Sequence, residues 1–281
     1  MNESYRDLLA LVPPIRRARG FRLYTAAGRR FVDLWQYGGA AVLGHTAPGV
    51  LLSLKDTASR GLSAPLPHPA GRRLEQALLR LFPGRAVRLY ADEASVDRAL
   101  ASAGRGDLRF ASFVDPALTD VPAGAFGALW RPWAPESDVR PAALAPVLPV
   151  PWPGRPAALL LDASVADAFP PSDILSPVAL AAAGRAVDDL RAALPVRAEV
   201  RFGRIDAALS EGGPWTRRGP YLRPERALSG EGYATLFRRF LGAGFLLPPD
   251  AALPAILPGE LSAGEVAALA ALLRESTSEI L

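Results

Sequence analysis

Residues 20–50, GFRLYTAAGRRFVDLWQYGGAAVLGHTAPGV, decide the fold of this chain. Alternating apolar residues flank the turn Ala27-Gly28, and this pattern predicts a tight β-hairpin; the alternating positions are Phe21, Leu23 and Phe31. The loop that follows ends in the residues Gly-His-Thr-Ala-Pro, and the proline, Pro48, predicts the start of a helix.

Length and composition limit what the chain can be. Its 281 residues can bury a large core in one or two domains. It has no cysteine, which excludes disulfides, thiolate metal sites and a cysteine nucleophile. His45 and His68 are its only histidines, so a multi-histidine metal site is also excluded. It has neither a long apolar run nor a signal-peptide pattern, and we expect a cytoplasmic protein without a membrane partner.

The charged residues argue against a nucleic-acid partner and against chemistry that needs a lysine amine. The net charge is +4, but the arginines are scattered as singles and pairs without interleaved aromatic residues, so we expect no nucleic-acid partner. Of the 32 lysines and arginines, only Lys55 is a lysine. Arginine cannot replace lysine where an amine must form an imine, because the guanidinium stays protonated and is not nucleophilic. The spacing of apolar residues after Pro48 predicts a helix with Lys55 on its polar, solvated side.

The remaining elements follow from periodicity and from helix caps. The pattern predicts helices at 4–12 with Ser4 as cap, 72–81, about 93–103, 176–194 and 231–241, and strands at 86–90, 108–114 and 157–161. The strand at 157–161 is apolar throughout, which is typical of a buried parallel strand. We expect an irregular surface loop at 131–156 and a loop-rich segment at 203–230 with Trp215 and Tyr221 buried. Ser262 and Glu265 predict a capping box for the last helix.

Together these stretches resemble the class III pyridoxal-phosphate aminotransferases of fold type I, and their pattern is nearest to glutamate semialdehyde aminomutase. The resemblance lies in the hairpin with its Gly-His-x-x-Pro loop, in residues 61–90, and in Gly-Phe-Leu-Leu-Pro-Pro at 244–249. The matching residues of the first stretch are Gly28, Phe31, Val32, Asp33, Leu34, Leu43, Gly44, His45 and Pro48. The resemblance implies an α/β fold: an abridged large domain at 61–195, and a small α+β domain built from 1–60 and 196–281.

The resemblance also implies positions for a cofactor, and this sequence departs from the family at each of them. The turn that holds the phosphate in the family is Asp92, Glu93 and Ala94 here, and two carboxylates would repel a phosphate by about 1 kcal/mol or more at ~4 Å. Acidic residues at a helix start need no ligand, because they stabilise the helix dipole. Asp115 falls where the family aspartate pairs with the pyridine nitrogen, although a strand-end aspartate is more often a turn or cap residue.

The Schiff-base lysine of the family is absent. Alignment with the family pattern without gaps, made from each side of the position, places this lysine at Leu148 or at Val150. We therefore expect no catalytic residues, no bound cofactor and no metal, and an aminotransferase-like protein that acts by dimerisation or partner binding. The resemblance implies a homodimer, or a heterodimer with an active relative.

An alternative keeps the protein an enzyme. It would bind pyridoxal phosphate without a covalent bond through Asp115, or use His45 with Asp92, Glu93 and Asp115 for other acid-base chemistry. His45 is equally explained by capping and a buried hydrogen bond. A third interpretation, a decayed gene product, is disfavoured because helix faces and caps are kept throughout.

Overall fold

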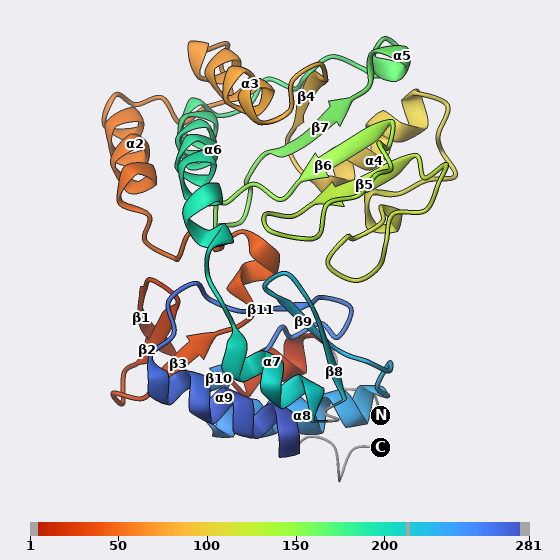
Figure 1. The fold of residues 1–281 in the computed structure, drawn as a ribbon. Helices are drawn as coiled ribbons and strands as arrows, with labels where there is room; N and C mark the ends of the chain where they lie inside the picture. The colour runs from red at the N-terminus through yellow and green to blue at the C-terminus, as the bar shows by residue number, and fades with distance from the viewer. Residues whose placement is uncertain (1–4, 212–213, 276–281) are drawn as a thin grey trace. The chain divides into compact units, whose positions relative to one another are not determined.

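The computed structural model describes residues 5–211 and 214–275 (Figure 1). The chain forms two compact units: unit 1 is Met1–His45 with Val196–Leu281, and unit 2 is Thr46–Pro195. The first boundary lies just after His45 and not near residue 60, because the helix that begins at Pro48 packs its Val50 in the core of unit 2. No helix in the described part of the chain is long and apolar enough to cross a membrane.

Unit 2 is built on a four-stranded sheet with the order β4-β7-β6-β5. Its strands are β4 (Ala86–Tyr90), β5 (Gly127–Trp130), β6 (Ala143–Pro146) and β7 (Ala157–Leu161). Its helices are α2 (Pro48–Ser59), α3 (Pro69–Leu81), α4 (Glu93–Ser102), α5 (Ala163–Ala166) and α6 (Pro177–Ala198), which runs on into unit 1, and a 3-10 turn, η2, spans Phe110–Ser112. Along β7, Ala158 and Leu160 join the apolar cluster of α3 and α6, whereas Leu159 and Leu161 join that of α4. The sheet is therefore buried on both faces.

The apolar run at 157–161 does form a strand, but its predicted parallel direction is wrong. β7 pairs antiparallel with β4 and with β6, and within this sheet the parallel pair is β5 with β6. A run of apolar residues indicates that a strand is buried on both faces of a sheet. A strand can be buried in this way whether it pairs parallel or antiparallel with its neighbours.

Two other predictions for unit 2 are wrong. In place of a strand at 108–114 there is η2, followed by an isolated bridge at Val114. The Asp97 carboxylate accepts the Phe110 N–H at 2.6 Å, and the Ser112 hydroxyl accepts the Arg109 N–H at 3.1 Å. These backbone N–H groups are therefore bonded to side chains and cannot pair with a neighbouring strand. The expected loop at 131–156 contains β6.

Unit 1 joins the two ends of the chain. Its larger sheet has the order β1-β2-β3-β10, with β1 (Ile15–Arg19), β2 (Arg22–Thr25), β3 (Arg30–Asp33) and β10 (Phe245–Leu246). The smaller sheet has the order β11-β9-β8, with β8 (Trp215–Arg218), β9 (Tyr221–Pro224) and β11 (Ala255–Ile256). The helices are α1 (Tyr5–Ala10), α7 (Gly203–Ser210), α8 (Gly230–Gly242) and α9 (Ala263–Glu275), and a 3-10 turn, η1, spans Gln36–Gly39.

The sequence predicted most of unit 1. The hairpin of β2 and β3 is confirmed, and Gly28 in its turn has a φ of 80°, which glycine adopts without strain. Trp215 and Tyr221 are buried as predicted. The prediction of a loop-rich segment at 203–230 is wrong, because the segment contains α7, β8 and β9. These elements are too short for their apolar residues to show a clear period. Ser4, the predicted cap of the first helix, lies outside the described residues.

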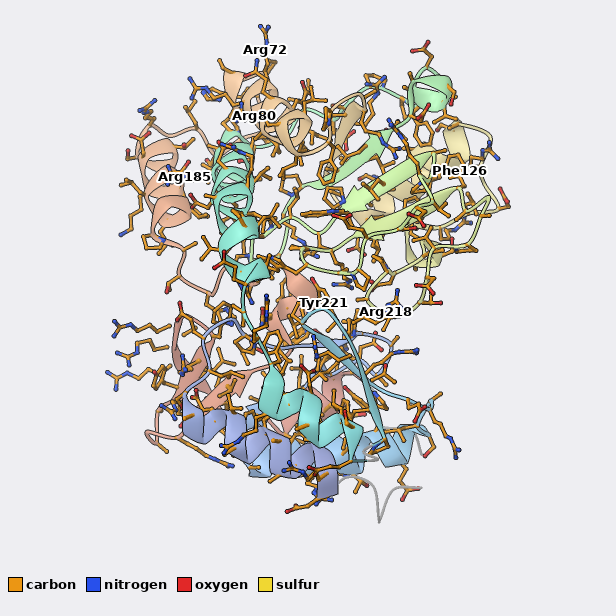
Figure 2. The ribbon with its side chains drawn as sticks, viewed as in Figure 1. Arg72, Arg80, Phe126, Arg185, Arg218 and Tyr221 are labelled. Atoms are coloured by element: carbon orange, nitrogen blue, oxygen red, sulfur yellow. The ribbon has the colours of Figure 1, made fainter. Side chains whose placement is uncertain are left out.

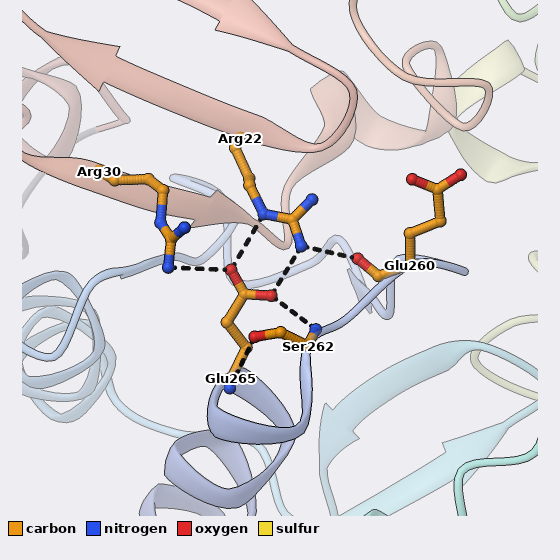
Figure 3. A network of polar contacts seen from close by, with 5 residues as sticks. All are labelled: Arg22, Arg30, Glu260, Ser262 and Glu265. Atoms are coloured by element: carbon orange, nitrogen blue, oxygen red, sulfur yellow. Dashed lines mark hydrogen bonds and ion pairs between the residues drawn. The ribbon is translucent and has the colours of Figure 1, made fainter.

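A buried carboxylate ties β2 and β3 to α9 (Figure 3). Glu265 is 7% exposed and accepts two hydrogen bonds from Arg22, at 3.0 and 2.7 Å, while Arg30 lies 3.3 Å away. The predicted capping box is confirmed: the Ser262 N–H donates to the carboxylate at 2.8 Å, and the Glu265 N–H donates to the Ser262 hydroxyl at 3.3 Å. Burial raises the pKa of Glu265, but the bonds from Arg22 and Ser262 outweigh it and lower the pKa to about 2.

We predict that Glu265→Gln destabilises the protein by about 2 kcal/mol at neutral pH, because Arg22 loses its charged acceptor. The folded-state pKa of about 2 lies below the ordinary value of 4.5, so the carboxylate stabilises the fold above pH 4.5 and this stabilisation disappears as the pH falls through about 2. Urea unfolding at several pH values should show the difference between variant and wild type shrink with acid. Glu275, which is on α9 like Glu265, forms a solvent-accessible ion pair with Arg239 of α8, so Glu275→Gln is the control and should change little.

Candidate functional site

The start of α4, where the family holds a phosphate, is occupied by the helix's own cap. The Asp92 carboxylate accepts the Ser95 N–H and the Ser95 hydroxyl, each at 2.7 Å. These bonds, first that of the Ser95 hydroxyl, lower the pKa of Asp92, so it is ionised at neutral pH. Glu93 is exposed and lies 3.7 Å from Arg155, and Ala94 is exposed. A phosphate at this position would be repelled by the Asp92 carboxylate, which already caps α4.

Asp115 is held by a buried arginine. Its two carboxylate oxygens accept Arg131 Nε at 2.7 and 2.8 Å, and Arg131 Nη2 lies 2.7 Å from Oδ2. The arginine side chain is 2% exposed and that of Asp115 is 10% exposed. Oδ1 also accepts the Ala117 N–H at 2.9 Å, so Asp115 caps a turn. With this geometry the carboxylate neutralises Arg131, and removing it would be destabilising because a buried cation would lose a charged acceptor.

The two positions counted for the Schiff-base lysine lie inside the core. Leu148 is 2% exposed and Val150 is fully buried, both in the cluster that packs α3 and α6 against the sheet. The Val150 N–H donates to the Leu148 carbonyl at 2.8 Å, which closes a tight turn. Lys55 lies exposed on α2, as predicted. The residues at the positions that the resemblance implies therefore do not fit pyridoxal phosphate: neither counted position carries an amine, and both are filled by apolar packing.

His45 and Asp33 form a polar pair in unit 1. His45 Nε2 lies 2.7 Å from Asp33 Oδ2, and the side chains are 20% and 2% exposed. The other oxygen of Asp33 accepts the N–H groups of Trp35 and Gln36, both at 2.9 Å. Asp33 thereby closes the loop between β3 and η1, in which Gln36 has the unusual φ of 46°.

The Gly-His sequence has a packing reason in the same loop. Gly44 has a φ of 87°, and a Cβ there would come within 3.2 Å of the backbone of Gly20. The N–H of His45 donates to the Gly20 carbonyl at 2.9 Å. The buried hydrogen bond offered above as one explanation of His45 is present, and its side-chain partner is Asp33. The sequence does not identify that partner, because a spacing of twelve residues through a loop carries no periodic signal.

The residues of the acid-base alternative are divided between the two units. His45 belongs to unit 1, whereas Asp92, Glu93 and Asp115 belong to unit 2. Within residues 5–211 and 214–275, no group of three or more histidines and carboxylates is placed to hold a metal ion. His68 caps α3 by accepting the Ala70 N–H at 3.2 Å, so this side chain has a structural role at the start of a helix.

Comparison with known proteins places the chain in a family and a fold. No family model matches it. A Treponema pallidum (strain Nichols) protein described only as uncharacterized is 32% identical over 301 residues, covering 91% of this chain and 92% of that protein. The chain belongs to the family of that protein. An ornithine delta-aminotransferase of Plasmodium falciparum superposes with a TM-score of 0.73 at 12% identity over 98% of both chains.

A second structure agrees. The acetylornithine aminotransferase of Elizabethkingia anophelis superposes with a TM-score of 0.68 at 14% identity, over 99% of this chain and 100% of that one. The fold is that of the class III, fold-type-I aminotransferases. A glutamate-1-semialdehyde 2,1-aminomutase of Verminephrobacter eiseniae is 38% identical over 69 residues, which are 25% of this chain and 16% of that enzyme. This local match agrees with the aminomutase pattern noted in the sequence of this aminotransferase-like protein.

We predict that restoring the lysine does not restore the site. Leu148→Lys should lower the free energy of unfolding by about 3 kcal/mol or more, because an amine replaces a fully packed side chain. Circular dichroism during heating measures the loss, and pyridoxal phosphate should produce no new visible band. Ile174→Lys, at a side chain that is 61% exposed, is the control and should unfold close to the wild type. A Leu148→Lys protein of wild-type stability with a saturable band would contradict the packing argument.

Proposed function

We propose that this aminotransferase-like protein is non-catalytic and acts by binding another protein chain. The observation that carries the proposal is the burial of Leu148 and Val150 in the apolar core at the positions of the Schiff-base lysine. Without an amine there is neither an internal aldimine nor a base for the proton shift of the family mechanism. The only lysine, Lys55, is a surface residue of α2.

The other cofactor positions support the same proposal. Asp115 is committed to Arg131, and Asp92 is committed to the start of α4. Each side chain has acquired a structural partner where the family uses a ligand. The fold could then be retained for its surface, and folds of this class normally assemble as two-fold dimers.

The partner that we propose is a second copy of this chain or an active relative. Large apolar side chains are exposed on α2 and in the segment after it: Leu51, Leu52 and Leu66 are 38%, 69% and 50% exposed. A contiguous apolar patch formed by these side chains would be typical of a surface that pairs with another chain. We therefore place the contact with the partner there.

The first test is a titration with pyridoxal phosphate, followed by visible absorbance. We expect no band beyond the weak imine that Lys55 and the amino terminus give, and none from Lys55 in a Lys55→Ala variant. A saturable spectrum that survives in the variant would overturn the proposal and favour the alternative, an enzyme that holds the cofactor without the usual lysine. Cofactor bound stoichiometrically in the purified protein would have the same meaning.

The second test is the mass in solution, measured by light scattering after gel filtration. We expect the wild type to elute as a dimer, and Leu52→Asp to shift it to monomer, because a carboxylate would be buried in an apolar contact. Val196→Asp is the matched control, since Val196 is also 69% exposed but lies in unit 1. If the wild type is monomeric and does not pair with an active relative, the partner proposed here is wrong.

A further inference from the structure

The edge strand of the larger sheet in unit 1 is unusually basic. β1 has the sequence IRRAR, and among the described residues it pairs with β2 alone. Its three arginines, Arg16, Arg17 and Arg19, are exposed. None of the three has an ion-pair partner in the part of the chain that the structure describes. An edge strand has backbone donors and acceptors along its outer side that a further strand can use.

Two of these arginines are presented on one face of the sheet. Ala18, opposite Leu23, packs against the core of unit 1. Because side chains alternate along a strand, Arg17 and Arg19 project from the opposite face at a spacing of two residues. Arg17 lies over the ring of Tyr24, its cross-strand neighbour, with the guanidinium carbon 4.6 Å from the ring centroid. This contact holds the guanidinium in place without neutralising it.

The local charge is unbalanced at Arg19. Its cross-strand neighbour is Arg22, and like charges directly opposite each other destabilise a sheet. Glu265 neutralises Arg22, but no carboxylate reaches Arg19 among the described residues. The same sheet also carries Arg29 and Arg30, of which Arg29 is bound to the carbonyls at the end of α8. A carboxylate beside Arg17 and Arg19 would remove this imbalance.

We propose that the outer edge of β1 binds an extended acidic segment of a partner protein as an added strand, with carboxylates at alternate positions facing Arg17 and Arg19. Backbone hydrogen bonds would supply affinity and the two-residue spacing of the arginines would supply selectivity. Arginine suits this role because its planar guanidinium binds a carboxylate through two parallel hydrogen bonds. The proposal concerns unit 1 and does not depend on the absence of catalysis or on the contact proposed for α2.

The experiment uses the full chain and two labelled peptides of about ten residues each, followed by fluorescence anisotropy. One peptide alternates glutamate and threonine; the other has the same composition with all its glutamates in one block. We expect the alternating peptide to bind more tightly than the block peptide. Arg17→Glu/Arg19→Glu should weaken its binding by about tenfold or more, equal to about 1.4 kcal/mol.

Arg72→Glu/Arg73→Glu is the matched control. It makes the same change in charge at two exposed residues of α3 in unit 2, where Figure 2 shows Arg72 pointing away from the protein, and it should bind the peptide like the wild type. Circular dichroism checks that both variants are folded. A single-stranded DNA oligonucleotide and vesicles containing anionic phospholipid are the competing probes.

Three results would overturn the proposal. Equal binding of the two peptides would mean a general basic surface without strand register. Tighter binding of the DNA or of the vesicles, lost in the Arg17/Arg19 variant, would assign the arginines to a different class of partner. No binding of the alternating peptide would mean that the arginines only protect the edge strand from unwanted pairing.

Discussion

The carboxylate of Glu265 is the interaction on which unit 1 depends. It joins Arg22 and Arg30, near the start of the chain, to the first turn of α9, near its end. A charge buried to this extent is stable only when it is paired and fully hydrogen-bonded. Four donor groups meet that condition: two from Arg22, one from Arg30 and the N–H of the capping residue Ser262. The parallel pairing of β3 with β10 crosses the same sequence distance. Unit 1 can therefore form only after most of the chain has been synthesised.

In unit 2, the residues at the positions where the sequence resemblance implies a cofactor all have structural partners. Leu148 and Val150 contribute to the core, Asp115 neutralises Arg131, and Asp92 begins α4. Each of these contacts stabilises the protein without a cofactor. Reintroducing one family residue would break one such contact and would leave the others unchanged, which is why a single substitution is not expected to recover a site.

The loop from β3 to α2 gives the short Gly-His motif a structural role. Asp33 binds His45 and two backbone N–H groups, and Gly44 combines a φ of 87° with a close approach to Gly20, where a Cβ would lie 3.2 Å from the backbone. These contacts fix the path of the chain as it leaves unit 1. The Gly-His pair has a sufficient structural role there, independent of any ligand.

The sequence by itself determined the elements with strong local signals. The hairpin around Gly28, the apolar face of α8, the Ser262–Glu265 capping box and the solvated position of Lys55 all follow from spacing within a few residues. The absence of a second lysine also follows from the sequence alone.

Only the tertiary structure decided the direction of β7, the pairing of Asp115 with Arg131, and the division of the chain after His45. The physical reason is the same in each case. Strand direction and ion-pair partners depend on groups far apart in the chain, and their apolar or charged character is compatible with several partners. The sequence shows that such groups will be buried, and the packing of the whole unit selects the partner that each one finds.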